Sequence, residues 1–305
     1  MTSAIANILA LLVMPIVVTG TINRVKARWA GRVGPPIFQL AFDLWRLVRK
    51  TPVYSKVTTP VFRVGPAIVL VTSVASACIV PLAGTGSLVA FSFDFVWFAY
   101  VWSFGRVALM LGALDTGSSF EGMGASREAT FATLLEPVLF LVAGALCLHG
   151  GVRSFEAALV PHLDGPSAVV MWLCAIGALM IVIQVEAARM PVDDPTTHLE
   201  LTMVHEVMIL DHGGPELAML QAASAIKTFV AISVAATLLD PLAGESSILA
   251  IGAHLGICLA IAIGLGMIES LVARLKLRIV PQYIVVALVS AGIALLSTLG
   301  RGGFS

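Results

Sequence analysis

Long apolar runs dominate this sequence and constrain its fold more than any other feature. A helix that crosses the hydrocarbon core of a bilayer needs roughly 20 mostly apolar residues. Eight runs meet this requirement, at about 3–22, 65–83, 92–114, 129–149, 167–188, 216–239, 247–270 and 280–299. The sequence therefore predicts an all-α integral membrane protein with about eight transmembrane helices, organised as a single polytopic membrane domain over 1–305.

The composition agrees with a chain whose main solvent is lipid. Of the 305 residues, 58% are hydrophobic and only 12% are charged, about half the charged fraction of soluble domains. Eighteen basic residues balance eighteen acidic residues, so no net charge points to nucleic acid as a partner. The four cysteines lie in apolar runs without a CxxC pair, which argues against a disulfide framework or a metal–thiolate site. We expect no metal ligands and no catalytic residues in this chain.

Positive charges are unevenly distributed among the loops between the apolar runs. Segment 23–64 contains nine Lys and Arg residues and segment 271–279 contains three, whereas the loops on the opposite side carry only Arg153 and Arg301. Lys and Arg accumulate in cytoplasmic loops. The loops predicted to lie in the cytoplasm are 23–64, 115–128, 189–215 and 271–279. With eight spans, both termini are then outside the cell, in a multi-pass protein of the inner (plasma) membrane.

Segment 37–50, in the first of these loops, has the pattern of an amphipathic helix. Polar residues recur at Gln39, Asp43, Arg46 and Lys50, while apolar residues occupy the other faces. Such a helix lies in the membrane interface with its apolar side toward the acyl chains. The pattern leaves open whether it is only a lipid-surface helix or also binds a partner protein.

Residues 186–216 form a burst of charge between two apolar runs. Pro191 should end the fifth transmembrane helix, because the residue before proline avoids the helical region. Asp194 is a good N-cap for a short following helix. The glycines and proline at 213–215 should end that helix, so we predict a structured loop here.

Ionisable residues on this short helix raise the question of a metal site. His198 and His205 share one helix face, but His205 and Glu206 are not followed by the second histidine of a zinc-binding HExxH helix. Hydrogen-bonded structural histidines are therefore the favoured interpretation. Glu206 falls in an apolar stripe, so its carboxylate should be paired, have a raised pKa, or line a water-filled cavity.

Ionisable residues also occur inside or at the edges of the apolar runs. They are Asp94, Arg106, Glu128, Glu136, Glu186, Lys227 and Glu269. A charge at membrane depth costs at least about 2.5 to 3.5 kcal/mol on insertion scales, so such residues are usually paired or functional. They are interpreted either as an ion relay or as acids that Arg106 and Lys227 neutralise. Asp94 and Glu269 lie near the ends of runs and are expected to be solvated.

Three blocks of sequence resemble one family. The stretch GRVGPPIFQLAFDLWRLVRK at 31–50 resembles the first cytoplasmic loop of complex I subunit 1 and of the membrane subunit of formate hydrogenlyase-type hydrogenases. Segments 122–137 and 186–216 resemble the family's next charged helix and its contact with peripheral redox subunits. Thr196 and His198 stand where quinone-reducing members carry acids. The chain is therefore most similar to the membrane subunit of group 4 (formate hydrogenlyase or hydrogenase-4 type) hydrogenases.

The resemblance implies a subunit of an oxidoreductase complex that has no redox cofactor of its own. Peripheral hydrogenase-like large and small subunits would carry the nickel-iron centre and the iron–sulfur clusters. Antiporter-like membrane subunits would complete the path of protons or sodium ions. The implied ion-path residues are Glu128, Glu136, Glu186, Glu200, Glu206 and Lys227. The implied docking residues are Arg32, Gln39, Asp43, Arg46, Arg189, Asp193 and Asp194.

Two other functions remain open at this point. The first is the quinone-site subunit of a complex I-like NADH dehydrogenase. A cavity between the first cytoplasmic loop (23–64, called loop one below) and the 189–215 loop can persist both in quinone-reducing and in hydrogenase-type members of the family. The second is a secondary transporter, with the Asp-Pro and Gly-Gly-Pro breaks as substrate-binding interruptions. Those breaks lie in a charged loop, outside the apolar runs, which disfavours the transporter.

Overall fold

The computed structural model describes residues 2–162, 164–189, 191–193, 203–245, 247–273 and 275–302, which contain helices and no strand. The helices are α1 (Thr2–Trp29), α2 (Gln39–Val48), α3 (Pro60–Ile79), α4 (Asp94–Asp115), α5 (Ser119–Gly150), α6 (Phe155–Leu159), α7 (Pro166–Glu186), α8 (His205–Met208), α9 (Gly214–Leu239), α10 (Ile248–Leu271) and α11 (Val280–Gly302). Among them α1, α3, α4, α5, α7, α9, α10 and α11 are long and apolar enough to cross a membrane. The prediction of an all-α fold with eight spans is confirmed.

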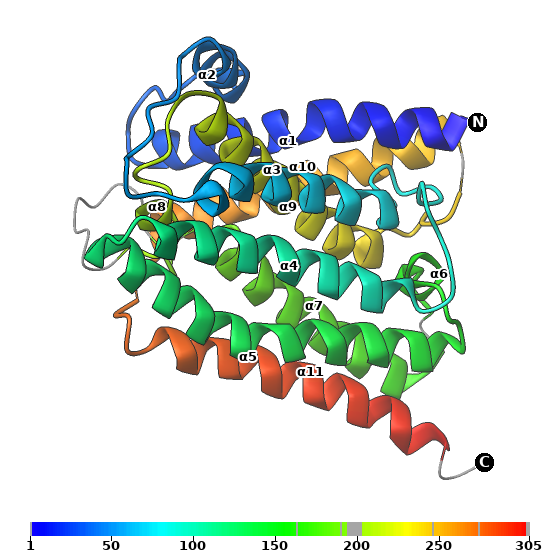
Figure 1. The fold of residues 1–305 in the computed structure, drawn as a ribbon. Coiled ribbons are helices and arrows are strands. Elements are labelled where there is room, and N and C mark those ends of the chain that lie inside the picture. The colour runs from blue at the N-terminus through cyan, green and yellow to red at the C-terminus, as the bar shows by residue number, and fades with distance from the viewer. Residues whose placement is uncertain are drawn as a thin grey trace.

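The long helices run side by side, and the short ones gather at the two ends of the bundle (Figure 1). Helices α2 and α8 lie at one end, which we call the α2 end. Helix α6 lies at the opposite end, together with the start of α1 and the last turns of α11, and we call this the α6 end. An even number of spans brings both ends of the chain to the same side, as the sequence predicted.

Helix α9 is the central element of the bundle. It packs against α1, α3, α7 and α10, and its side chains Phe229, Ile232 and Leu238 are almost completely buried. Many of its other residues are small, which lets neighbouring helices approach closely within a membrane. The outer helices expose apolar side chains instead, as expected for surfaces that face acyl chains or partner subunits.

Helices α1 and α5 extend farthest beyond the predicted apolar runs. Helix α1 continues to Trp29 through basic residues, and α5 begins at Ser119, ten residues before its predicted start. The predicted loop 115–128 is thus largely the first part of α5, whose 32 residues make a helix about 48 Å long. Hydropathy locates only the lipid-facing part of a helix, so polar extensions are invisible to it. Pro137 lies inside α5, where it removes one backbone hydrogen bond.

Helix α2 occupies the middle of the predicted amphipathic segment. It buries Leu47 and exposes Phe42, Trp45 and Val48, so both the helix and its unequal faces are present. A Cβ atom at Gly20 of α1 would overlap the carbonyl oxygen of Ile37, just before α2. Loop one therefore reaches α1 through a contact that only glycine allows. The location of α2 in the membrane interface stays a prediction.

The loop between α7 and α9 differs from the prediction in its second half. The predicted helix start after Asp194 lies outside the described residues, and α8 is a single turn at His205–Met208. Gly213 does not end a helix: it is the N-cap residue of α9, and Pro215 lies in the first turn of α9. Proline is favoured there because its missing N–H has no partner in a first turn anyway.

Candidate functional site

The guanidinium of Arg106 is the centre of a buried charge cluster between α4, α5 and α7. Its Nε lies 3.0 Å from Glu128 Oε1, and its Nη1 lies 3.3 Å from Glu136 Oε1. Its Nη2 pairs with Glu186 Oε1. The Arg106 side chain is only 4% exposed. A guanidinium has five N–H donors in a planar fork, so it can pair with several carboxylates at once, as it does here.

The helices explain why these side chains meet. Glu128 and Glu136 lie eight residues apart on α5, which puts them about two turns apart and about 80° apart around the helix axis, so both lie on one broad side of the helix. Glu186 is the last residue of α7, and its Oε2 accepts a hydrogen bond of 2.7 Å from Trp102 Nε1, one turn before Arg106 on α4. In the sequence Arg106 lies 22, 30 and 80 positions from Glu128, Glu136 and Glu186, so only tertiary packing brings the four side chains together.

Lys227 of α9 completes the cluster. Its Nζ lies 5.3 Å from the ring centroid of Trp102, within the range of a cation–π interaction. We call Arg106, Glu128, Glu136, Glu186 and Lys227 the Arg106 cluster. When every group is ionised, three carboxylates face two cations, which leaves one negative charge in excess. That excess can be met by a proton or another cation, so neutralisation by Arg106 and Lys227 is not complete.

The three carboxylates differ in their access to the surface of the chain. The side chains of Glu186, Glu128 and Glu136 are 5%, 23% and 38% exposed, respectively. The cluster therefore reaches from the interior of the bundle to the outer surface of α5. A carboxylate at this depth is costly to leave in lipid, so the exposed side of Glu136 calls for water or a protein neighbour.

A cavity of about 620 Å³ lies at the α2 end, between α1, loop one and the loop that follows α7. Its walls include five residues predicted for docking or the ion path: Arg32, Gln39, Asp43, Arg189 and Glu206. This is the cavity between loop one and the 189–215 loop that the family resemblance allowed. Glu206, predicted to be paired or to line a water-filled space, lies on its wall.

Glu269 forms a second charge group on the wall of this cavity. Its carboxylate lies 3.5 Å from Lys26 Nζ and 3.0 Å from Arg189 Nη1, and Arg189 also donates to Asn23 Oδ1 at 3.2 Å. The expectation that Glu269 is solvated was wrong, because two cations hold it in a buried position. This group ties α1, the end of α7 and α10 together below the cavity.

Asp94 was also expected to be solvated, and it is completely buried. Its Oδ1 accepts a hydrogen bond of 2.6 Å from the backbone N–H of Phe155 at the start of α6. Ser154 Oγ lies 3.4 Å from the same carboxylate. Asp94 therefore fastens the first turn of α4 to α6, and its position at the end of an apolar run did not reveal this partner.

The remaining predicted docking residues have different environments. Asp43 accepts hydrogen bonds from Gln39 at 3.1 Å and from Arg46 at 3.0 Å on the surface of α2. Asp193 is almost completely buried, and its Oδ2 accepts from the backbone N–H groups of Val204 and His205 at 3.0 and 3.1 Å. Asp193 thus closes the base of the loop. Asp194 and Glu200 lie outside the described residues.

Arg127 links this loop to α5. Its Nη1 donates to the carbonyl oxygen of Met203 at 2.9 Å, and the next residue on α5 is Glu128 of the Arg106 cluster. The residue that binds the loop and a residue of the Arg106 cluster are therefore neighbours in one continuous helix.

Sequence reasoning missed two buried histidine sites. His212 stacks on Phe62 with ring centroids 3.9 Å apart, and its Nδ1 lies 3.3 Å from Glu216. Burial lowers the pKa of His212, while the nearby carboxylate opposes this change. His254 pairs with Asp240 at the α6 end. His254 lies inside the apolar run 247–270, which was a sequence signal for the His254–Asp240 pair. Asp240 gave no such signal, because it resembled an ordinary loop residue.

Among the described residues, no group of three His, Cys, Asp or Glu side chains is arranged to hold a metal ion. The four cysteines are free and lie on four different helices, α3, α5, α7 and α10. These four thiols are not arranged to hold an iron–sulfur cluster.

Comparison with known proteins gives consistent matches over most of the chain. The model of the NADH dehydrogenase family matches residues 2–299. Hydrogenase-4 component C of Escherichia coli (strain K12) is 30% identical over 241 residues, covering 78% of this chain and 75% of that protein. Formate hydrogenlyase subunit 4 of the same organism is 25% identical over 274 residues, covering 87% of each.

A solved structure has the same fold. It is a chain in the structure of the membrane-bound sulfane sulfur reductase, an archaeal respiratory membrane complex. The TM-score is 0.73 at 19% sequence identity, and the match covers 96% of this chain and 98% of the other.

Proposed function

Because this chain belongs to the NADH dehydrogenase subunit 1 family, we propose that it is the membrane-anchoring, ion-path subunit of an energy-converting, hydrogenase-type complex. The chain is a multi-pass membrane protein, and its relatives are subunits of multi-subunit membrane complexes. In this complex, electron transfer in the peripheral subunits is coupled to translocation of protons or sodium ions across the membrane.

The Arg106 cluster is the observation that carries the proposal. Three carboxylates compete for one guanidinium, and the cluster holds one negative charge more than its cations balance. A carboxylate gains affinity for a proton when its cation moves away and loses it when the cation returns. A small displacement of Arg106 among its partners would therefore move a proton from one acid to another.

Glu136 indicates the direction in which this path leaves the chain. Its side chain is the most exposed of the three acids, at a depth where contact with lipid is unfavourable. An adjacent membrane subunit that covers this face of α5 would give the carboxylate a polar neighbour. We place the antiporter-like partner subunits here.

The α2 end is the proposed docking face for the peripheral subunits. It carries α2, the 620 Å³ cavity and the loop closed by Asp193. Nine basic residues in segment 23–64 support a cytoplasmic location for this end by the positive-inside rule. The α6 end and both termini are then proposed to lie on the outer side of the plasma membrane. The nickel-iron centre and the iron–sulfur clusters belong to the partner subunits.

Substitution of the cluster acids tests the ion path. Glu186→Gln and Glu136→Gln keep side-chain size and remove titration, so ion pumping should fall while the complex stays assembled. Glu245→Gln, an exposed acid at the α6 end, is the matched control. Normal pumping by an assembled Glu186→Gln complex would remove that acid from the path.

A quinone-site subunit is the second candidate, and the cavity is the observation that favours it. Its volume falls within the range of about 300 to 1,000 Å³ typical of small-molecule sites. The two functions are distinguished by purifying the complex and assaying hydrogen evolution from a low-potential donor. Quinone reduction that quinone analogues block, without hydrogen chemistry, would favour the quinone-site function. The transporter alternative is weakened, because the Gly-Gly-Pro break begins α9 at the α2 end and does not interrupt a span.

A further inference from the structure

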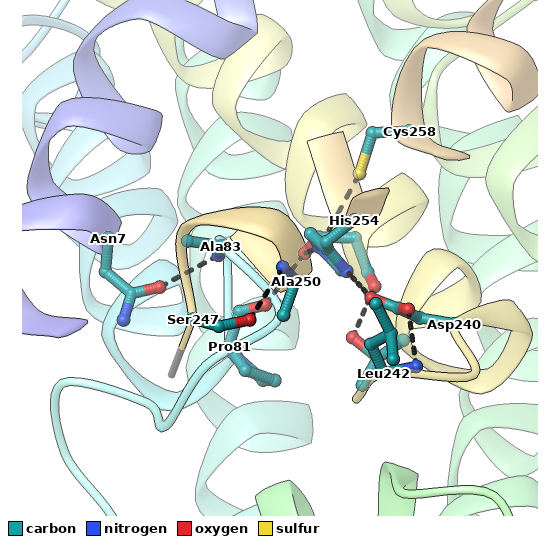
Figure 2. A network of polar contacts seen from close by, with 11 residues as sticks. Asn7, Pro81, Ala83, Asp240, Leu242, Ser247, Ala250, His254 and Cys258 are labelled. Atoms are coloured by element: carbon teal, nitrogen blue, oxygen red, sulfur yellow. Dashed lines mark hydrogen bonds and ion pairs between the residues drawn. The ribbon is translucent and has the colours of Figure 1, made fainter. Parts of the chain in front are cut away.

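A second buried polar cluster lies at the α6 end of the bundle, remote from the cavity at the α2 end. Asp240 follows the last residue of α9, and His254 lies on α10 (Figure 2). Both side chains have no exposed surface, and neither has Ser233 on α9. The ion path proposed above uses none of these residues.

His254 and Asp240 form an ion-pair contact through one nitrogen and one oxygen atom. His254 Nδ1 lies 3.4 Å from Asp240 Oδ2 as an ion pair, and neither atom has a hydrogen-bond partner among the described residues. The second oxygen of Asp240 accepts from the backbone N–H of Leu242 at 2.9 Å. One face of the carboxylate is thus held by the backbone, and the other is directed at the imidazole.

The other ring nitrogen of His254 contacts a hydroxyl. Nε2 lies 3.1 Å from Ser233 Oγ, and this hydroxyl also lies 3.2 Å from the carbonyl oxygen of Pro81, with geometry suited to donation. The Cys258 thiol is 3.6 Å from the same nitrogen. A continuous line of polar atoms therefore runs from Asp240 through the ring to the Pro81 carbonyl.

Few titratable groups face this imidazole. Asp240 faces it from the end of α9 and Cys258 from α10, while the loop at 80–86 has no titratable residue and places Gly84 against the ring. Among the residues that the structure describes, His254 is the only ion-pair partner of Asp240 within 4 Å. Glu245 is exposed on the following loop, and no lysine or arginine in the described ranges balances Asp240.

Counting protons shows what this arrangement favours. A neutral imidazole beside an ionised carboxylate leaves one negative charge buried without a cation, which is strongly unfavourable. One added proton makes the pair neutral, either as imidazolium with carboxylate or as imidazole with carboxylic acid. The pair is therefore most stable when it binds one additional proton, compared with a neutral imidazole next to an ionised carboxylate.

The Ser233 hydroxyl allows the pair to bind and release that proton without movement of heavy atoms. With the ring protonated, Nε2–H donates to Ser233 Oγ and the hydroxyl hydrogen points to the Pro81 carbonyl. With the proton gone, Nδ1–H remains beside Asp240 Oδ2, and the hydroxyl hydrogen turns toward Nε2. Both states use the same heavy-atom positions. We propose that Asp240 and His254 form a proton-binding site. The Ser233 hydroxyl rotates when the proton binds or leaves, so that it donates to the Pro81 carbonyl in one state and to His254 Nε2 in the other.

Two loops close this site from the α6 end. A Cβ atom at Gly84 would lie 2.7 Å from Cβ and Cγ of His254, and Gly84 has a positive φ of 70°. Its carbonyl oxygen accepts from the N–H of Gly244 at 3.1 Å. The backbone therefore lies directly against the ring, and exchange of the proton with that end requires the two loops to separate. The site belongs to this chain and does not depend on the chemistry proposed for the partner subunits.

Histidine nitrogen NMR and infrared spectroscopy of the complex in lipid bilayers test the proposal. Isotope labelling reports the protonation of all six histidines, and His254→Gln identifies the signal of His254 by its loss. Near neutral pH we expect one of two results. Either His254 is an imidazolium that becomes neutral in Asp240→Asn, or its ring is neutral and Asp240→Asn removes a carboxylic acid band from the infrared spectrum.

The opposite result is equally clear. A neutral His254 ring together with an unchanged carboxylic acid spectrum in Asp240→Asn would show that the pair holds no extra proton, and would overturn the proposal. If His254→Gln does not fold, Asp240→Asn alone carries the infrared test. Ser233→Ala should shift the His254 signals, whereas Thr237→Ala, a buried hydroxyl one turn further along α9, should leave them unchanged.

Discussion

Removal of Arg106 gives the most quantitative test of the charge cluster. Arg106→Gln leaves three carboxylates without their shared cation. Glu186, at 5% exposure, suffers most, whereas Glu128 and Glu136 reach the surface in part. Breaking a buried ion pair by removing one partner costs about 3 to 5 kcal/mol. We expect the free energy of unfolding to fall by about that amount, chiefly because of Glu186.

A double-mutant cycle isolates the contribution of Glu186. Adding Glu186→Gln to Arg106→Gln removes the unpaired buried charge, so the double variant should be more stable than Arg106→Gln alone. A coupling of about 2 kcal/mol, within the range for residues in contact, corresponds to roughly a thirtyfold change in the unfolding equilibrium. Denaturant unfolding in lipid–detergent micelles measures it.

The control is Arg46→Gln, because this side chain is 68% exposed and its partner Asp43 is also accessible to solvent. Its free energy of unfolding should change little. If the effects of Arg106→Gln and Glu186→Gln simply add, Arg106 does not neutralise Glu186, and the reasoning from three carboxylates on one guanidinium fails.

Three further predictions concern topology, packing and pH. Cysteines introduced at Ser55 and Ser154 should react with an impermeant reagent from opposite sides of the membrane, and labelling from one side would contradict the topology. Gly20→Val should lower the free energy of unfolding by more than about 2 kcal/mol, because its side chain overlaps loop one, whereas Gly144→Ala has open space and should not. Because burial lowers the pKa of His212, the unfolded chain takes up a proton at higher pH than the folded chain does. Stability should therefore fall as pH decreases through about 6.5, and His212→Gln should reduce that slope in pH-dependent unfolding.

Hydropathy was sufficient to predict the number of spans but not their extents. The apolar runs mark where a helix meets lipid, so α1 and α5 were predicted too short wherever they carry charged residues. The Gly-Gly-Pro sequence at 213–215 was ambiguous, since glycine and proline occur at both ends of helices, and the structure uses them to begin α9. Local sequence does not decide between these roles.

The candidate site was predictable as a set of residues but not as an arrangement. The cost of charge at membrane depth singled out Arg106 and its acids, because any residue there needs a partner. Their shared guanidinium depends on how α4, α5 and α7 pack, which no local pattern encodes. Asp240 was missed for the same reason: at the end of an apolar run it resembled a solvated residue until α10 placed His254 against it.

The unusual length of α5 has a mechanical consequence. One end of this helix is fastened to the loop after α7 by the hydrogen bond from Arg127 to Met203, and Glu128 and Glu136 follow on the same rigid rod. A rigid helix moves as one body, so a displacement at its end also moves the residues further along it without any change in their local conformation. Pro137, directly after Glu136, removes a backbone hydrogen bond and is the natural bending point. Movement of the loop would thus swing Glu128 about Pro137 relative to Arg106, while Glu136, next to the bending point, and the part of α5 beyond the proline move little.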